Sequence, residues 1–326
     1  MNKKMRPVLD GDFWMIGDNP DLGELQGLKE KKDGRSPQEC VDHHVFQSID
    51  GGWHLWGCIR NTVVGRILYH WRSKDLTDTH WEKTGEIIRA DINSGESVNM
   101  VNGDEWIQSP FVIKKGSKFY FYYGGHSAGI DENGNTFRKD SRRAQCQISL
   151  MTSLDGRNWV RYFNKDYQSR VFVGPGETRD PCLIKIDNQW LLYYAGYEFI
   201  DGKEYPGFYV RSSTDFINWS DYKLVHRDLD PKFGEGKWET ECPHVVKRQG
   251  YYYLFRTQNY SKAITHVFRS KDPYNFGIDN AEEKYIGSIE VGAPEIIVDE
   301  TGQEYITSNH ELIGGTKICK LKWGVN

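Results

Sequence analysis

A hairpin-like unit occurs five times along this chain of 326 residues, and this repetition constrains the fold more than any other feature. Each unit starts with an anchor residue that is followed by proline, or by His43 in the first unit. A hydrophobic run, a turn with Gly or Asn and an aromatic run come next, as is typical of a β-hairpin. The five anchors are Asp42, Ser109, Asp180, Cys242 and Ala293.

A second motif follows each of the first four hairpins. It runs from a serine through an aspartate to an aromatic residue, at 73–81, 153–159, 213–219 and 270–276. We interpret these motifs as turns between outer strands, with the aromatic side chain packed between units. Repeats of β-rich units are typical of propeller blades. The sequence therefore predicts an all-β protein, folded as a five-bladed β-propeller.

The repeats also predict the domain organisation. One blade cannot bury its faces alone, so we expect residues 40–326 to form a single closed propeller that carries the catalytic site. Residues 1–39 form a polar lead-in. Its segment 12–17 is expected either to add a strand to the last blade, which would close the ring, or to cover the mouth of the ring.

Charge and hydropathy exclude several classes of partner. The 42 basic and 46 acidic residues are interspersed, which argues against nucleic acid as a partner because no basic stripe is present. No run of about 18 apolar residues occurs, so no membrane span is expected. The first residues are basic but lack the apolar core of a signal peptide. We therefore expect a cytoplasmic protein, unless an export signal has been removed.

Six cysteines are scattered along the chain without a CxxC pair. In a chain of this length, that spacing indicates buried free thiols more than a disulfide framework or a zinc site. We therefore predict neither a bound metal nor a cofactor for the reaction. A structural cation in the central channel is the one exception that we keep open.

Three carboxylates stand at or beside the anchors, namely Asp42, Asp180 and Glu241. The innermost strand of each propeller blade lines the central channel, so residues at its start should converge. Carboxylates that are brought together repel each other, which raises the pKa of at least one. Hydrolysis of a glycosidic bond needs one protonated and one ionised carboxyl group. The pattern therefore predicts a glycosidase.

The sequences Arg179-Asp180-Pro181 and Glu241-Cys242-Pro243 resemble motifs of glycoside hydrolase family 32, the fructan hydrolases and invertases. The order Asp, Asp, Glu on blades one, three and four is similar to that of family 43, the arabinanases and β-xylosidases. Both families share a five-bladed propeller. The resemblance implies cleavage of a terminal bond in an arabinofuranoside, a fructofuranoside or a xyloside, with an oligosaccharide or glycoside as the partner molecule.

The same resemblance implies a role for each carboxylate. Asp42 would be the nucleophile, as in family 32, or the general base, as in family 43. Asp180 would stabilise the transition state or modulate a pKa, Glu241 would be the general acid, and Arg179 would hold Asp180 or a sugar hydroxyl. The chain departs from both families at Asp42-His43-His44 and at Ser109, where many family 43 members have a carboxylate nearby. It therefore resembles an outlying branch.

Other polar and aromatic residues near the anchors are candidates for substrate binding: His43, His44, His244, His126, Trp106 and Trp238. The histidines at blade entrances either bind a cation or orient a carboxylate, or they form hydrogen bonds around channel water. We favour the second reading because the ligand spacing of a zinc site is missing. Trp106 and Trp238 would be sugar platforms or buried packing residues.

Two alternatives to a hydrolase use the same fold. One is a glycan-binding propeller that has lost its activity, which the unusual Asp42-His43-His44 entrance leaves open. The other is a glycoside phosphorylase or transferase that uses the same carboxylates. A propeller that serves only protein contacts would not require three carboxylates at blade entrances.

Overall fold

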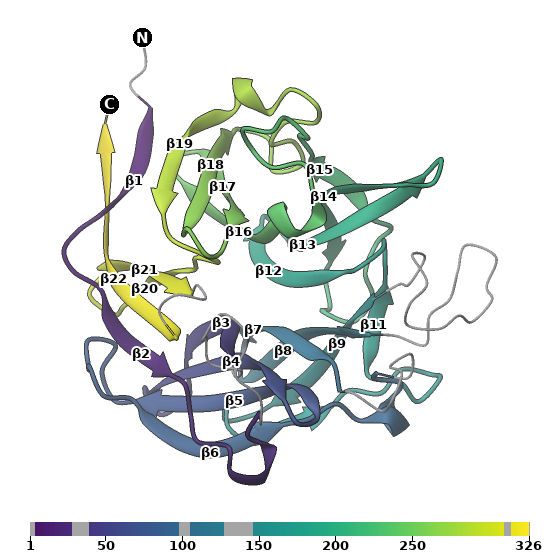
Figure 1. Ribbon diagram of the computed structural model, residues 1–326, viewed down its shortest axis with the longest axis vertical. Coiled ribbons are helices and arrows are strands. Elements are labelled where there is room, and N and C mark those ends of the chain that lie inside the picture. Colours follow the sequence, from purple (N-terminus) through teal and green to yellow (C-terminus); the bar gives the residue numbers. More distant parts are fainter. Residues whose placement is uncertain (1–3, 28–38, 98–104, 127–145, 310–313, 326) are drawn as a thin grey trace. The chain divides into compact units, whose positions relative to one another are not determined.

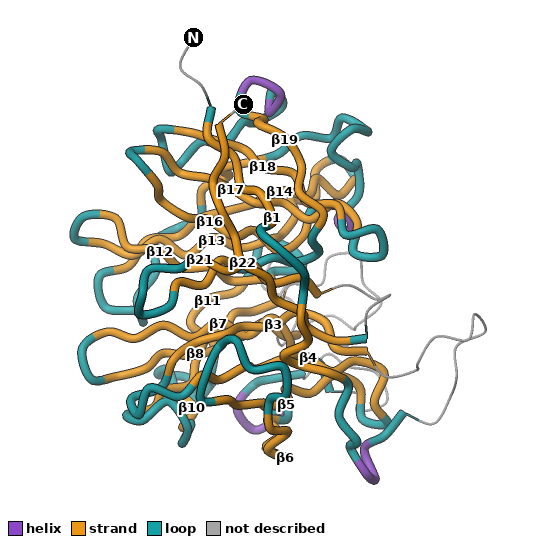
Figure 2. The backbone as a smooth tube through the Cα atoms, turned by 90° about the vertical axis from the view of Figure 1, so that its left-hand side faces the viewer, coloured by secondary structure: helices purple, strands orange, loops and turns teal. Residues whose placement is uncertain are grey.

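The computed structural model describes residues 4–27, 39–97, 105–126, 146–309 and 314–325. Within these ranges the chain is built of β-strands, and the helical segments are 3-10 turns of three residues (Figure 1; Figure 2). The strands form five antiparallel sheets of four or five strands each. The protein is a five-bladed β-propeller, so the predicted fold is confirmed. None of the helical segments described is long or apolar enough to cross a membrane.

The chain divides into two compact units, of which one comprises residues 16–181. This unit contains blades one and two, together with the turns η1 (Gly23–Leu25) and η2 (Ile92–Ser94). Blade one consists of β3 (Glu39–Gln47), β4 (Trp53–Thr62), β5 (Gly65–Ser73) and β6 (Glu82–Ile88). Blade two consists of β7 (Ile107–Lys115), β8 (Lys118–His126) and β9 (Cys146–Ser153), with β10 (Val160–Arg161) and β11 (Arg170–Val173) both paired to β9.

The other unit comprises residues 1–15 and 182–326. Blade three is β12 (Arg179–Ile186), which starts at the boundary of the units, followed by β13 (Gln189–Ile200), β14 (Lys203–Ser213) and β15 (Lys223–His226). Blade four is β16 (Glu241–Arg248), β17 (Tyr251–Asn259), β18 (Ile264–Ser270) and β19 (Tyr285–Glu290), with turns η4 (Lys237–Glu239) and η5 (Ala281–Glu283). Blade five is β20 (Ile296–Val298), β21 (Glu304–Asn309) and β22 (Gly315–Val325).

The first strand of the chain, β1 (Met5–Leu9), belongs to the last blade. It lies beside β22, with Met5 opposite Val325 and Leu9 opposite Leu321 (Figure 1). The segment around 12–17, which was expected to supply a strand, contains β2 (Trp14–Asp18). β2 also pairs with β22, so the expected strand is present, and β1 adds a second strand from residues closer to the N-terminus.

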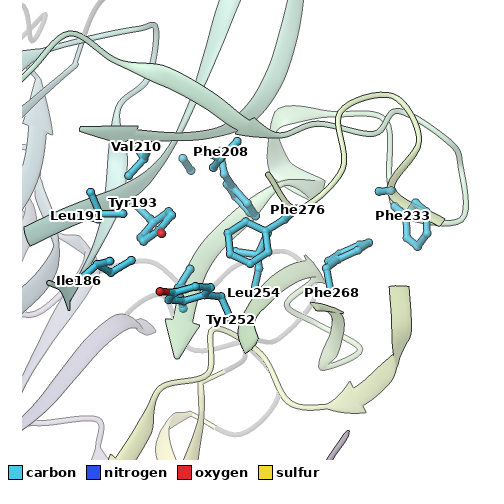
Figure 3. Close-up of a cluster of buried hydrophobic side chains, with 14 residues drawn as sticks. Ile186, Leu191, Tyr193, Phe208, Val210, Phe233, Tyr252, Leu254, Phe268 and Phe276 are labelled. Atoms are coloured by element: carbon cyan, nitrogen blue, oxygen red, sulfur yellow. The ribbon is translucent and has the colours of Figure 1, made fainter. Parts of the chain in front are cut away.

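Aromatic residues of the repeated second motif pack against the preceding blade, as predicted. Trp159 contacts Phe46 of blade one edge to face, with ring centroids 6.1 Å apart. Phe276 of blade four belongs to the apolar cluster that also contains Leu191 and Tyr193 of β13 and Leu254 of β17 (Figure 3). These contacts bury apolar area between blades one and two and between blades three and four, and such burial is the main favourable term in folding.

The turns of this motif are closed by side-chain hydrogen bonds. The Ser153 hydroxyl accepts from the backbone N–H groups of Asp155 and Gly156, while Asp155 Oδ1 accepts from those of Arg157 and Asn158. Ser213 and Asp215 repeat the arrangement in blade three. Such local bonds explain why Ser and Asp recur at these positions.

All six cysteines are free thiols, and all except Cys242 are buried, as expected from their spacing.

Every anchor residue adopts the left-handed backbone conformation, which is uncommon for residues other than glycine. The φ angles are 44° at Asp42, 52° at Ser109, 59° at Asp180, 52° at Cys242 and 46° at Ala293. At the first, second and fourth anchors the strand register shifts between the flanking residues. This is the pattern of a β-bulge, which bends a strand and redirects a side chain. The sequence repeat therefore marks a left-handed residue at each blade entrance, which lies in a strand bulge at three of the five.

Side chains two positions after an anchor connect neighbouring blades. Each of them forms a hydrogen bond with the backbone three positions after the next anchor. The bonds join His44 Nε2 to Val112 O (2.9 Å), Val245 N to Cys182 Sγ (3.4 Å) and Ile296 N to His244 Nε2 (3.0 Å). These links fix the inner strands of adjacent blades to one another at the level of the anchors.

The carboxylate of Glu96 is the centre of a buried polar cluster in blade two. Only 3% of the residue is exposed. Arg161 donates to both carboxylate oxygens, from Nε and Nη2, at 3.0 Å each. The hydroxyls of Ser169 and Tyr123 and the backbone N–H of Asp91 also donate to Glu96. The cluster therefore ties the segment after β6 to β8, β10 and the segment before β11.

We expect Glu96→Gln to lower the free energy of unfolding by about 3 kcal/mol, because removal of one partner of a buried ion pair leaves the other charge uncompensated. Urea denaturation of the purified protein measures this change. Asp18→Asn is the matched control, since Asp18 pairs with Lys83 at the surface, and it should cost less than about 1 kcal/mol. Equal losses in both variants would contradict the role given to Glu96.

Three buried histidines are held in the neutral form. Burial and the neighbouring His70 lower the pKa of His54 to about 4. Burial and the charge of Arg256 lower the pKa of His266 to about 4, and the same two causes hold the pKa of His226 well below its usual value. Each of these histidines therefore gains a proton more readily in the unfolded chain than in the folded one.

Because the unfolded state binds more protons between about pH 6.5 and pH 4, we expect the free energy of unfolding to decrease as the pH falls through this range. The slope should reach about 1.4 kcal/mol per pH unit for each histidine that is protonated only on unfolding. Denaturation at a series of pH values measures it. Replacement of His266 by Gln should reduce the slope, because one of the three histidines is then missing, and constant stability of the parent protein across the range would contradict this account.

Candidate active site

Three anchor residues of the unit formed by residues 16–181 meet at one hydroxyl group. The hydroxyl oxygen of Ser109 lies 2.7 Å from Asp180 Oδ1 and 3.1 Å from Asp42 Oδ2. Ser109 and Asp180 are buried, and Asp42 is half-buried. All three residues have left-handed backbone angles and belong to the inner strands β3, β7 and β12. The structure thus brings Asp42 and Asp180 together, as the sequence predicts.

The proton of Ser109 can serve only one carboxylate at a time, because a hydroxyl group has a single hydrogen to donate. When Ser109 donates to Asp180, its oxygen can only accept from Asp42, which then needs a proton of its own. When Ser109 donates to Asp42, the same condition applies to Asp180. The shared hydroxyl therefore couples the charge of Asp42 to that of Asp180.

Arg179 lies beside this pair. Its Nε is 3.6 Å from Asp180 Oδ2, and both side chains are buried. Its Nη1 donates to the backbone carbonyl of Glu177 at 3.2 Å, which fixes the guanidinium group. A buried cation next to a carboxylate favours the ionised form of that carboxylate. Arg179 is therefore placed to hold Asp180 ionised, one of the two roles expected for it.

Glu241 is the first residue of β16 and lies in the unit that includes residues 182–326. It is half-buried and pairs with Thr257 of β17 at the start of the bulge that contains Cys242. Position and partial exposure make its carboxyl group available to a ligand.

The segment that leads to Glu241 is organised by Arg256, a fully buried residue of β17. Its guanidinium group donates to the carbonyl oxygens of Asp228, Gly234 and Glu239 at 2.8–3.3 Å, to Thr240 Oγ1 at 2.9 Å and to His226 Nε2 at 3.2 Å. Burial lowers the pKa of Arg256 to about 10, so the group remains charged at neutral pH. One cation thus holds the backbone up to the residue that precedes Glu241.

A glycine makes this close packing possible. Gly234 has φ +92°, and a Cβ atom at this position would lie 2.4 Å from Cβ of Glu239. Glu239 in turn accepts from the backbone N–H groups of Glu235 and Gly236 through Oε2. The turn before Glu241 is therefore fixed by the hydrogen bonds of Arg256 and Glu239 and by the close packing of Gly234 against Glu239.

The two candidate sugar platforms differ in what covers them. Trp238, in the turn η4, is 55% exposed, and the ammonium group of Lys237 lies 5.3 Å from its ring. Since Trp238 is three residues before Glu241, it offers an open aromatic surface near that carboxylate. This supports the prediction of a sugar platform at Trp238, which remains to be tested.

Trp106 is covered on both faces. The guanidinium carbon of Arg66 lies 3.8 Å from the ring centroid, and His126 stacks on the ring at 4.6 Å and 12°. Two groups this close must lie on opposite faces, because they would otherwise overlap. In addition, Trp106 Nε1 donates to Gln108 at 3.1 Å. These contacts favour the packing interpretation of Trp106 and place His126 against the indole ring, while sugar binding by either residue stays a prediction.

The histidines at the blade entrances have structural contacts. His44 forms a hydrogen bond with the carbonyl oxygen of Val112 in blade two. Both ring nitrogens of His244 face protein atoms, because Nε2 accepts from the N–H group of Ile296 and Nδ1 lies 3.7 Å from Cys182 Sγ. Burial raises the pKa of Cys182 to about 12, so this partner is a neutral thiol. His43 is buried. These contacts agree with the interpretation of the histidines at the blade entrances as hydrogen-bonding residues. Substrate contact by His43, His44 or His244 stays a prediction.

Two residues of the site were missed in the sequence. The sequence identifies Ser109 as an anchor, but only as one that lacks a carboxylate. Its position in the repeat, equivalent to those of Asp42 and Asp180, is the signal that could have shown its role. Arg256 carries no motif, since its partners are backbone carbonyl groups. The absence of a required cofactor remains an expectation.

Comparison with known proteins agrees with this geometry. The model of the glycosyl hydrolases family 32 N-terminal domain matches residues 45–305, which is most of the chain. No curated protein sequence matches.

Solved structures with the same fold include two enzymes that cover most of this chain. A family 43 enzyme from Xanthomonas citri in complex with xylotriose has a TM-score of 0.60 and 14% identity, over 88% of this chain and 90% of that one. An exo-1,5-α-L-arabinanase from a bovine ruminal metagenomic library has a TM-score of 0.58 and 18% identity, over 86% and 92%. At such identity the likeness shows the fold alone.

A third structure is the family 32 β-fructofuranosidase of Bombyx mori, with a TM-score of 0.58 and 17% identity over 87% of this chain. The match covers 59% of that enzyme. The family model, which extends over more than half of the sequence, decides the assignment: the chain belongs to glycosyl hydrolase family 32 and is a glycosidase.

Proposed function

We propose that the protein is an exo-acting hydrolase that removes a terminal furanose unit from a glycoside or short oligosaccharide. In this proposal Asp42 attacks the anomeric carbon, Glu241 protonates the leaving oxygen and Asp180 stabilises the transition state. The observation that carries the proposal is the shared hydroxyl of Ser109, which lies within hydrogen-bonding distance of both Asp42 and Asp180.

The reaction has two steps that follow from these roles. First, an oxygen of Asp42 forms a bond to the anomeric carbon while the glycosidic carbon–oxygen bond breaks and Glu241 gives its proton to the leaving oxygen. Second, Glu241 takes a proton from water, whose oxygen attacks the anomeric carbon and releases Asp42. The anomeric configuration is retained, and both carboxyl groups return to their starting states.

Asp180 and Ser109 support Asp42 through charge. Positive charge develops on the sugar ring in the transition state, and the ionised carboxylate of Asp180, held by Arg179, would stabilise it. When Asp42 forms the ester bond, it loses its negative charge and no longer needs the Ser109 proton. Ser109 can then donate to Asp180 alone, at the shorter of its two distances.

The family assignment favours a fructofuranoside as the substrate. The structural neighbour from family 32 is named a β-fructofuranosidase, while other neighbours are named an arabinanase and a β-xylosidase. Arabinofuranosides and xylosides are therefore the other sugars to compare. Trp238 would provide the apolar surface for a sugar ring beside Glu241.

We expect Asp42→Asn and Glu241→Gln to lower kcat by about 100-fold or more, because each removes a group that transfers a proton or forms a bond in the reaction. Asp180→Asn should also lower kcat, with little change in KM, since it acts in the transition state. The measurement is hydrolysis of fructosides, arabinofuranosides and xylosides, with nuclear magnetic resonance to follow the anomeric configuration of the first product.

The control is Asp187→Asn, an exposed aspartate in the turn between β12 and β13, which should retain wild-type activity. A wild-type protein that binds these sugars but hydrolyses none of them would contradict the proposal and favour a glycan-binding propeller. Inversion of the anomeric configuration would instead show that Asp42 acts as a general base.

A second variant tests the support of the general acid. Arg256→Lys keeps a positive charge but loses the planar group that reaches several acceptors at once. We expect kcat to fall by about tenfold with KM nearly unchanged, because Glu241 would no longer be held in position. The control Arg269→Lys, on strand β18, should have no such effect. A variant that loses thermal stability but keeps the wild-type kcat would show that Arg256 is only structural.

A further inference from the structure

A pocket of about 380 Å³ lies at the hairpin ends of blades one and two. It is lined by residues of the turn after β3, by His54 of β4, by the end of β5 and the turn that follows it, and by Arg157 of blade two. Asp42 and Gln47 are separated by five positions along β3, which at about 3.3 Å per residue is about 17 Å. The pocket is therefore separate from the carboxylate pair at the other end of the same strand.

A chain of hydrogen bonds sets the protonation of the one buried residue in this pocket, His54, which is 2% exposed. Its Nδ1 lies 2.8 Å from His70 Nε2. His70 Nδ1 lies 3.1 Å from the hydroxyl oxygen of Thr84 and 3.3 Å from Glu86 Oε2. Thr84 donates its own proton to the backbone carbonyl of His70, so both oxygens can only accept. His70 therefore carries its proton on Nδ1.

It follows that His70 Nε2, in a neutral ring, accepts a hydrogen bond from His54 Nδ1. The other ring nitrogen of His54, Nε2, then carries a lone pair and no proton. A Cβ atom at Gly52, another lining residue, would lie 3.6 Å from this nitrogen, which places it on the pocket side. Among the residues that the structure describes, no hydrogen bond to His54 Nε2 is found. Burial lowers the pKa of His54 to about 4, so the lone pair is present at neutral pH.

The charges of the lining restrict what the pocket can bind. Arg72, Lys74 and Arg157 are balanced by Asp50, Asp78 and Glu82. Arg72 pairs with Glu82 at 2.7 Å, and Arg157 lies 3.4 Å from Asp50. An anion would meet three carboxylates and a metal ion would meet three cations, so neither gains from the field of the pocket as a whole. A neutral ligand with several hydroxyl groups can use donors and acceptors of both kinds.

We propose that this pocket binds a sugar residue, one hydroxyl of which donates a hydrogen bond to His54 Nε2. Lys74 and Arg157, at the exposed rim, donate to other oxygens of the sugar. A volume of 380 Å³ is within the range of small-molecule sites. The site would hold a carbohydrate without cleaving it, so the proposal goes beyond the hydrolysis at Asp42 and does not depend on which glycoside is hydrolysed.

Hydrogen–deuterium exchange of the full chain, with short fructo-, arabino- and xylo-oligosaccharides as probes, tests the proposal. The Asp42→Asn variant is used so that the probes stay intact. We expect at least one oligosaccharide to slow exchange in residues 48–54 and 73–82. In the double variant Lys74→Ala and Arg157→Ala, we expect the sugar concentration for half-maximal protection to rise about tenfold or more.

The same double substitution in the otherwise wild-type protein should leave the hydrolysis of small aryl glycosides unchanged, which separates this site from the catalytic one. Lys83→Ala with Arg89→Ala, which removes one lysine and one arginine of blade one outside the pocket, is the control and should keep the protection. Three results would overturn the proposal: no oligosaccharide protects these segments, the double variant is protected like its parent, or zinc ions alone produce the protection.

Discussion

The left-handed residue at each blade entrance, which lies in a strand bulge at three of the five, is the constraint on which the rest of this structure depends. A strand in regular pleat would alternate its side chains between two faces, and the residue at its start would follow that alternation. The bulge releases one residue from this rule. In blades one to three the left-handed residues are Asp42, Ser109 and Asp180, and residues 138 positions apart along the chain share one hydrogen bond donor.

Such a backbone conformation has a cost, since left-handed residues other than glycine are disfavoured by roughly 1–2 kcal/mol. The conformation occurs at all five anchors, and side chains close behind three of them form hydrogen bonds with the next blade. His44, Cys182 and His244 connect the strand just after an anchor to the next blade. Strain and reactive groups therefore coincide at the blade entrances, as is common at functional sites.

The fold could be predicted because each blade repeats the same local pattern, and strands, turns and the aromatic contacts of Trp159 and Phe276 all follow from local sequence. The pairing of Asp42 with Asp180 could be predicted from their equivalent positions in two repeats. The roles of Ser109 and Arg256 could not be predicted. Ser109 acts through its distances to two carboxylates, and Arg256 through its distances to several carbonyl groups, and neither set of distances can be read from the sequence. Trp106 and Trp238 look alike in sequence, and only the contacts of Arg66 and His126 with the indole ring distinguish them.

The blade links contain two histidines that form the same kind of bond with opposite polarity. His44 donates to a carbonyl oxygen, whereas His244 accepts from the N–H group of Ile296. A protonated imidazole can still donate but has no lone pair left with which to accept. In a neutral ring, the His44 link therefore requires the proton on Nε2, whereas the His244 link requires it on Nδ1. Equivalent positions of the repeat therefore hold opposite tautomers of the same side chain, and the polarity of the backbone group in the next blade decides which tautomer each histidine adopts.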